Sequence, residues 1–134
     1  MQKSILNDFP DADISVSIVW IQMPGFADDE AAARRIAGTF NDQRVQHFYD
    51  RFPAHLAGKA FAGNLVQHGP AWDIYFFYGK GQQWTDTPPQ PVEWMHQLSG
   101  GTRADPAKFH TGAELFERLH ETMHEVTGAE CSAQ

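Results

Sequence analysis

The feature that most constrains the fold is the apolar segment at residues 14–23, ISVSIVWIQM. Its first half alternates apolar residues with Ser15 and Ser17, which is the period of a strand with one polar face. Its second half becomes apolar on both faces through Val19 and Ile21. A strand of this kind belongs in the middle of a sheet that is covered by helices. The segment therefore predicts an α/β protein rather than an all-helical one.

The rest of the chain alternates predicted helices and strands. Asp28 or Asp29 can cap a helix whose apolar stripe ends at Phe40, and the dipeptide Gly69-Pro70 introduces the most strand-like run of the chain, AWDIYFFY. The predicted elements after the first strand are a helix at 29–40, a strand at 44–50, a weaker helix at 54–66, a strand at 71–78 and a helix at 112–127.

Two connections have distinct predictions. Residues 79–81, GKG, supply the turn of a β-hairpin whose second strand begins with QQW at 82–84. The following stretch, at about 85–110, contains three prolines and predicts an inserted connection that has one helical turn near 92–98. The last helix has the strongest local signals, because Thr111 and Glu114 match the capping box and Gly128 is a natural stop.

The predicted order is strand, helix, strand, helix, strand, strand, helix. With 134 residues, the chain has the length of a single domain. Strand–helix–strand alternation predicts a right-handed parallel crossover, and the hairpin predicts an antiparallel edge. The fold class is therefore a mixed β-sheet with helices on both faces, formed by one domain at 1–134.

This order resembles the thioredoxin-like superfamily, whose minimal fold is β-α-β-α-β-β-α, over roughly residues 14–127. Pro70 precedes the third strand, where members usually carry a cis-proline that faces the active site. The runs VWIQM, AWDIYFFY and PPQPVEWMHQL also resemble a group of short bacterial thioredoxin-like proteins without an assigned activity.

The resemblance implies a member that cannot exchange thiols. The superfamily's redox motif belongs in the loop between the first strand and first helix, which here is Met23–Asp28 and contains no cysteine. Dithiol exchange needs an attacking thiolate and a resolving thiol. The one cysteine of the chain is Cys131, far from that loop in sequence.

Composition excludes several functional classes. The chain has 10 basic and 17 acidic residues, a net charge of −7, and no basic run, so we expect no nucleic-acid partner. No apolar run approaches the ~20 residues of a membrane span, and the first 13 residues lack a signal-peptide core. We therefore predict a cytoplasmic protein without a membrane partner. No P-loop, GxGxxG, GxSxG or EF-hand spacing is present in the sequence, and no cofactor is predicted.

One motif suggests a different function, a metal-dependent hydrolase. His120-Glu121-Thr122-Met123-His124 matches HExxH, in which two histidines hold zinc and the glutamate is the general base. At about 100° per residue, His120 and His124 lie about 90° and 130° from the centre of the apolar stripe, which predicts that they point to solvent. Downstream, only Glu130 and Cys131 are available as a third ligand. A soft-metal carrier that adds His110 and Cys131 is a third alternative.

The favoured function is a redox-inactive module that binds a protein or peptide partner. Aromatic residues close to prolines, near the Met23–Asp28 loop that lacks the redox motif, offer a contact surface. For Trp94 and His96 the alternative is packing with a structural hydrogen bond, and for Asp73 it is a carboxylate that caps an element end. The predicted surface consists of Met23, Pro24, Phe26, Pro70, Asp73, Trp94 and His96.

Overall fold

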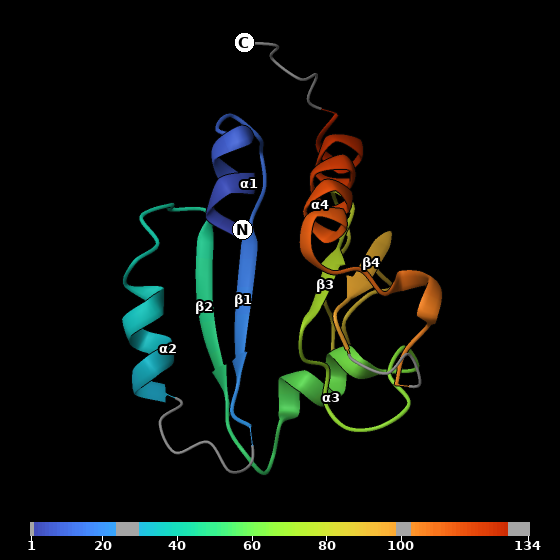
Figure 1. Cartoon of the computed structure of the whole chain (residues 1–134). Coiled ribbons are helices and arrows are strands. Elements are labelled where there is room, and N and C mark those ends of the chain that lie inside the picture. The colour runs from blue at the N-terminus through green and yellow to red at the C-terminus, as the bar shows by residue number, and fades with distance from the viewer. Residues whose placement is uncertain (1, 24–29, 99–102, 129–134) are drawn as a thin grey trace. The chain divides into compact units, whose positions relative to one another are not determined.

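The computed structural model describes residues 2–23, 30–98 and 103–128 (Figure 1). Within these residues the chain is mixed α/β, with four α-helices, one short 3-10 helix and four strands. The described strands form two separate two-stranded sheets, one parallel and one antiparallel, where the sequence predicts one mixed sheet. Among the same residues, no helix has the length and apolarity needed to cross a membrane.

The chain divides into two compact units that are interleaved in sequence. Residues Ile14–Trp72 form one unit, here called the inserted unit. The other unit combines Met1–Asp13 with Asp73–Gln134 and is here called the split unit.

The inserted unit is built on a parallel strand pair. Strands β1 (Val16–Ile21) and β2 (Val45–Asp50) pair in register from Val16↔Val45 to Ile21↔Asp50. Helix α2 (Glu30–Ala37) connects them, as the β-α-β pattern predicts, and Figure 1 shows the two strands side by side with α2 next to them. The predicted parallel pairing of two strands separated by a helix is therefore present, and each of the three elements is shorter than predicted.

Helix α3 (Leu56–Ala62) packs against β1 and β2 through a glycine. A Cβ atom on Gly58 would lie 2.7 Å from Cβ of Pro70 and 3.2 Å from Cδ1 of Ile21, so no side chain fits there. The same glycine donates its N–H to the buried Asp50 carboxylate at 2.7 Å, and its carbonyl accepts from the N–H of Ala71 at 2.7 Å. This contact joins β2, α3 and the Pro70 segment.

The split unit contains the antiparallel pair and the long C-terminal helix. Strands β3 (Ile74–Phe77) and β4 (Glu93–His96) pair from Ile74↔His96 to Phe77↔Glu93. A 3-10 helix η1 (Pro106–Lys108) leads into helix α4 (Gly112–Thr127). The buried apolar residues of this unit include Ile5, Leu6, Phe9, Met95, Leu98, Leu115, Leu119 and Met123.

Helix α1 (Gln2–Asp8) was not predicted, because residues 2–8 offer neither a cap nor a long stripe. Ile5 and Leu6 are nevertheless buried. Phe9, which follows the helix and is also buried, contacts the rings of His120 and His124 on α4. Tertiary packing on α4 therefore supplies what the local sequence lacks.

The predicted hairpin through residues 79–84 is wrong. Residues 82–84 form no strand, and the partner of β3 is β4, which lies in the segment predicted as a connection with a helical turn. The N–H of Val92 bonds to Phe77 O at 2.8 Å and that of Gln97 to Asp73 O at 2.9 Å, which extends the ladder at both ends. The Pro-rich stretch is thus the connection between two paired strands.

Helix α4 matches its predicted range, but the predicted capping box is wrong. Thr111 occupies the N-cap position with extended backbone angles and makes no side-chain capping bond. The Glu114 carboxylate instead accepts a hydrogen bond from Nδ1 of His110 at 3.0 Å. An adjacent imidazole has replaced the backbone amide as the partner of this glutamate.

Candidate functional site

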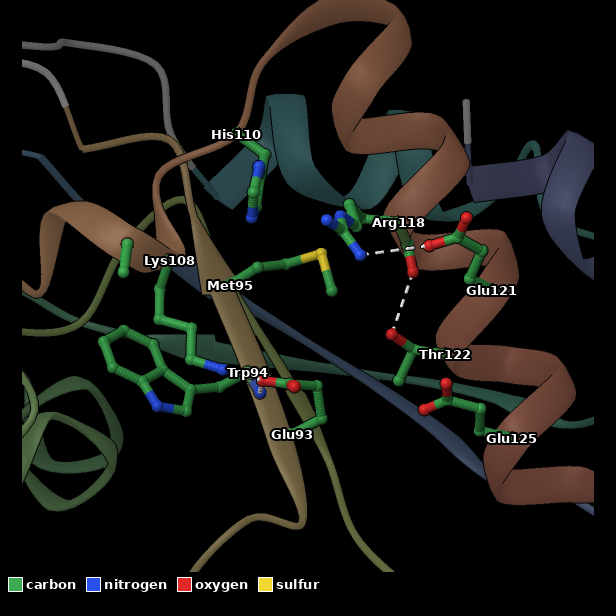
Figure 2. Close-up of a pocket in the computed structure, with 10 residues that line it drawn as sticks. Glu93, Trp94, Met95, Lys108, His110, Arg118, Glu121, Thr122 and Glu125 are labelled. Carbon is green, nitrogen blue, oxygen red and sulfur yellow. Dashed lines mark hydrogen bonds and ion pairs between the residues drawn. The ribbon is translucent and has the colours of Figure 1, made fainter.

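The split unit contains a polar cavity of about 240 Å³ between β4, η1 and α4 (Figure 2). Ten residues line it: Glu93, Trp94, Met95, Ala107, Lys108, His110, Arg118, Glu121, Thr122 and Glu125.

One face of α4 supplies four of the lining residues. Arg118, Glu121, Thr122 and Glu125 are spaced at i, i+3, i+4 and i+7, which places them on the same side of a helix. Thr122 is buried, and its hydroxyl donates to the carbonyl of Arg118 at 2.8 Å. The Arg118 guanidinium pairs with the Glu121 carboxylate at 3.3 Å. The helix therefore contributes three charged side chains and the buried Thr122 hydroxyl to the cavity.

The opposite wall is formed by β4 and η1. Lys108 on η1 forms an ion pair with Glu93 on β4, and the backbone N–H of Trp94 donates to the same carboxylate at 2.7 Å. The hydrogen bond from Lys108 is the largest influence on Glu93, and the Lys108 and Arg118 charges add to it, so the pKa of this carboxyl lies below its usual value. Glu93 is therefore an ionised, hydrogen-bonded wall residue at neutral pH.

His110 closes the cavity near the start of α4, with its ring directed inward in Figure 2. A carboxylate can only accept, so the contact between Nδ1 and Glu114 requires the proton to be on Nδ1. In the neutral imidazole this leaves a lone pair on Nε2. A neutral His110 thus offers Nε2 to the cavity as an acceptor.

Glu125 differs from the other carboxylates of the cavity. Lys108 neutralises Glu93 and Arg118 neutralises Glu121, whereas Glu125 has no hydrogen bond or ion pair with any described residue. In Figure 2 its carboxylate lies on the cavity side of α4. The lining therefore carries one carboxylate in excess.

The structure places His96, predicted as a surface residue, in the interior, with 0% of its surface exposed. Its Nδ1 accepts the N–H of Leu98 at 3.1 Å, so Nε2 carries the proton and donates to Asp105 O at 2.8 Å. The ring also stacks on Trp94, with 5.7 Å between centroids. His96 therefore fixes the chain around β4, as the structural alternative for this residue states.

The remaining residues of the predicted surface are divided between the units. Met23 and Pro70 belong to the inserted unit, whereas Asp73 and Trp94 belong to the split unit. Pro24 and Phe26 lie outside the described residues. The predicted surface thus draws on both units.

Two backbone features bear on that prediction. The cis proline bond of the described chain is Phe52–Pro53, and the bond before Pro70 is not cis, contrary to the expectation from the resemblance. Asp73 has a left-handed backbone with φ of 50°.

The electrostatics of Asp73 are also perturbed. Partial burial raises the pKa of the Asp73 carboxyl. Burial is the main reason that the pKa of Tyr75 is raised, and the negative charge of Asp73 raises it further.

The HExxH motif does not assemble as a hydrolase requires. His120 and His124 contact each other with 4.8 Å between centroids, and both contact Phe9. Both are half-buried rather than exposed as predicted, because Phe9 packs on this flank of α4. Glu121 instead faces Arg118 in the cavity. No group of three metal-ligating side chains occurs among the described residues, and Glu130 and Cys131 fall outside them.

A second candidate site, missed from the sequence, lies where β1 and β2 of the inserted unit end. Phe52 and Leu56 are 49% and 76% exposed, and together with Pro53 they form what we call the loop patch. The N–H of Phe52 donates to the Gln22 side chain at 3.0 Å, and Nε2 of His55 donates to the Gln22 carbonyl at 2.6 Å. The patch is thus anchored to the end of β1, and a Phe-Pro pair directly after a strand was the available signal.

No protein-family model, curated protein or solved structure matches this chain. The function must therefore be argued from its own residues.

Proposed function

We propose that this protein is a redox-inactive, thioredoxin-like binding module that holds a segment of a partner protein on the loop patch. The element order β1-α2-β2-α3-β3-β4-α4 supports this fold, as do the parallel pair in one unit and the antiparallel pair in the other. The loop before α2 contains no cysteine, which supports the absence of thiol exchange.

The observation that carries the proposal is the exposure of Phe52 and Leu56 on an anchored loop. Phe52 and Leu56 are large apolar side chains exposed to solvent. A contiguous exposed apolar patch is typical of a surface that binds another protein. The patch follows the carboxyl ends of two parallel strands, the edge at which α/β sheets bind ligands. His55, 5% exposed, fixes the loop to Gln22, so little conformational entropy is lost when a partner binds.

The charges around the loop patch indicate the chemistry of the partner. Arg51 and Lys59 flank the patch and are both exposed. Arg51 pairs with Glu30 at 2.6 Å, whereas Lys59 has no side-chain partner among the described residues. We therefore expect a segment that combines a large apolar side chain with a nearby carboxylate.

Affinity purification with quantitative mass spectrometry tests this function. We compare the wild-type chain with Leu56→Ser and with the control Val92→Ser, which removes a 55% exposed side chain from the split unit. A true partner is retained by the wild type and by the control, and is lost with Leu56→Ser. The purified partner should then bind the wild type at least tenfold more tightly than Leu56→Ser in calorimetry, because an interface anchor contributes more than about 1.4 kcal/mol.

A partner that Leu56→Ser and Val92→Ser retain equally would contradict the loop patch as the binding site. Lys59→Glu should weaken the same interaction and Lys59→Arg should preserve it.

The redox part of the proposal has its own test. In a dithiothreitol-driven insulin reduction assay, we expect the wild-type chain to match Cys131→Ser and to give no acceleration over dithiothreitol alone. Acceleration that depends on Cys131 would show that the chain exchanges thiols.

A further inference from the structure

We propose that the cavity of the split unit binds a linear alkylammonium ligand, a small molecule or side chain with a primary amine on an alkyl chain. The inference is independent of the proposed function, because the cavity and the loop patch belong to different units. It rests on the charge, the hydrogen-bonding character and the shape of the cavity.

The charge distribution of the chain favours a cation. The split unit contains twelve acidic and five basic residues, whereas the inserted unit contains five of each, so the whole net charge of −7 resides in the split unit. In the cavity, two ion pairs neutralise Glu93 and Glu121, and Glu125 remains unpaired. A single ammonium group would complete the charge balance of the lining, in a unit whose field attracts cations.

Several groups of the cavity can receive an ammonium group. The Glu125 carboxylate and Nε2 of the neutral His110 ring accept hydrogen bonds, and the indole of Trp94 can interact with a cation through its ring. The two lining cations, Lys108 and Arg118, are already engaged by carboxylates. An ammonium group donates three hydrogen bonds and accepts none, which matches this set.

The shape favours a narrow, linear ligand. A cavity of about 240 Å³ has room for the equivalent of about eight water molecules. The lining residues of α4 extend from Arg118 to Glu125, which is about 10 Å along a helix. Met95 and Trp94 supply apolar surface on the opposite wall for the alkyl chain.

Isothermal calorimetry with the full chain tests the inference. The probe is 1,6-diaminohexane, and the matched control is 1,6-hexanediol, which has the same chain without charge. We expect binding of the diamine and none of the diol, with an affinity that falls as sodium chloride rises, since salt screens ion pairs. Inorganic phosphate should not bind.

Two variants with the same change in net charge localise the site. Glu125→Gln should weaken diamine binding about three- to fivefold, as expected for a partly exposed ion pair. Glu117→Gln, an exposed residue of α4 outside the cavity, should change the affinity by less than about 1.5-fold. A trilysine peptide distinguishes the source: tighter binding than the diamine would indicate a lysine side chain, and weaker binding a free amine.

Three results would overturn the inference: equal binding of diamine and diol, equal loss in the two glutamine variants, or binding of phosphate in place of the diamine. Leu56→Ser should bind the diamine as the wild type does. Loss of the protein partner therefore tests the loop patch, and loss of the diamine tests the cavity.

Discussion

The two units of this chain differ in net charge and in the surfaces that they offer to a ligand. The split unit buries a complete hydrogen-bonded histidine, His96, and carries the whole net charge together with a charged cavity. The inserted unit has balanced charges, fixes its helix α3 by a backbone contact at Gly58, and leaves Phe52 and Leu56 in water. The two units therefore present different candidate sites, a charged cavity in one and an exposed apolar patch in the other.

The largest effect on this comparison should come from His96 in the split unit. In His96→Leu, the buried N–H of Leu98 loses its acceptor, and the carbonyl of the exposed residue Asp105 loses its donor. A buried unsatisfied group costs about 1–3 kcal/mol, so we expect a loss of about 2–3 kcal/mol in the free energy of unfolding. Urea denaturation followed by circular dichroism measures it.

His68→Leu, which changes an exposed histidine of the inserted unit, is the control for His96→Leu. Surface substitutions usually change stability by about 0.5 kcal/mol or less. If His96→Leu were no worse than this control, the buried network would not stabilise the split unit.

In the inserted unit, Gly58→Ala should be the most damaging small substitution. The new Cβ would lie 2.7 Å from the ring of Pro70, which has no flexible end that can move aside. We expect a loss of about 2 kcal/mol, typical of overpacking. In the control Gly38→Ala, the nearest atom lies at 3.5 Å, and stability should change little. Equal effects of both substitutions would show that the contact between α3 and Pro70 is loose.

A pH titration tests the ion pair between Asp42 and Arg44 in the inserted unit. Hydrogen bonds from Arg44 lower the pKa of Asp42 from 3.8 to about 2. Because the folded pKa is the lower one, the stabilisation is complete above the usual pKa and is lost as the pH falls towards 2. By carboxyl NMR, we expect a midpoint near 2 for Asp42, which Arg44→Ala returns towards 3.8. If the midpoint of Asp42 were the same in Arg44→Ala as in the wild type, Arg44 would not be the cause of the lowered pKa.

The smallest effect should come from the start of α4. Thr111→Ala should cost less than about 0.5 kcal/mol, because this side chain makes no capping bond, whereas a working cap contributes about 1 kcal/mol. Thermal unfolding is the measurement. A loss of 1 kcal/mol or more would mean that Thr111 does cap α4 in solution.

The elements that the sequence predicts best are those with a strong local period. The two-sided apolar run gives β1, and the stripe from Leu115 to Val126 gives α4, each within a few residues of the observed ends. Parallel pairing of β1 with β2 follows from the helix between them. These features depend on spacing that is contained within one segment.

The errors arise where distant segments decide the structure. Strand β4, Glu93–His96, lacks a clean polar–apolar alternation and follows prolines, so its pairing with β3 is invisible locally. Likewise, the direction of His120 and His124 depends on Phe9, more than one hundred residues earlier. The cavity combines β4, η1 and α4, so no local motif predicts it. The HExxH pattern suggests that Glu121 is the general base of a zinc site, whereas in the structure Glu121 pairs with Arg118.

The interleaving of the units has a consequence during synthesis. Helix α1 is translated before the inserted unit, yet the His120 and His124 rings that contact Phe9 belong to α4, which is translated after it. At about 5–20 residues per second, the interval between Phe9 and His120 is on the order of 10 s. Until His120 is made Phe9 lacks these two contacts, whereas translation of the inserted unit is complete before α4 begins. The nascent chain therefore carries Phe9 without its α4 contacts at a stage when residues 14–72 are all available to one another.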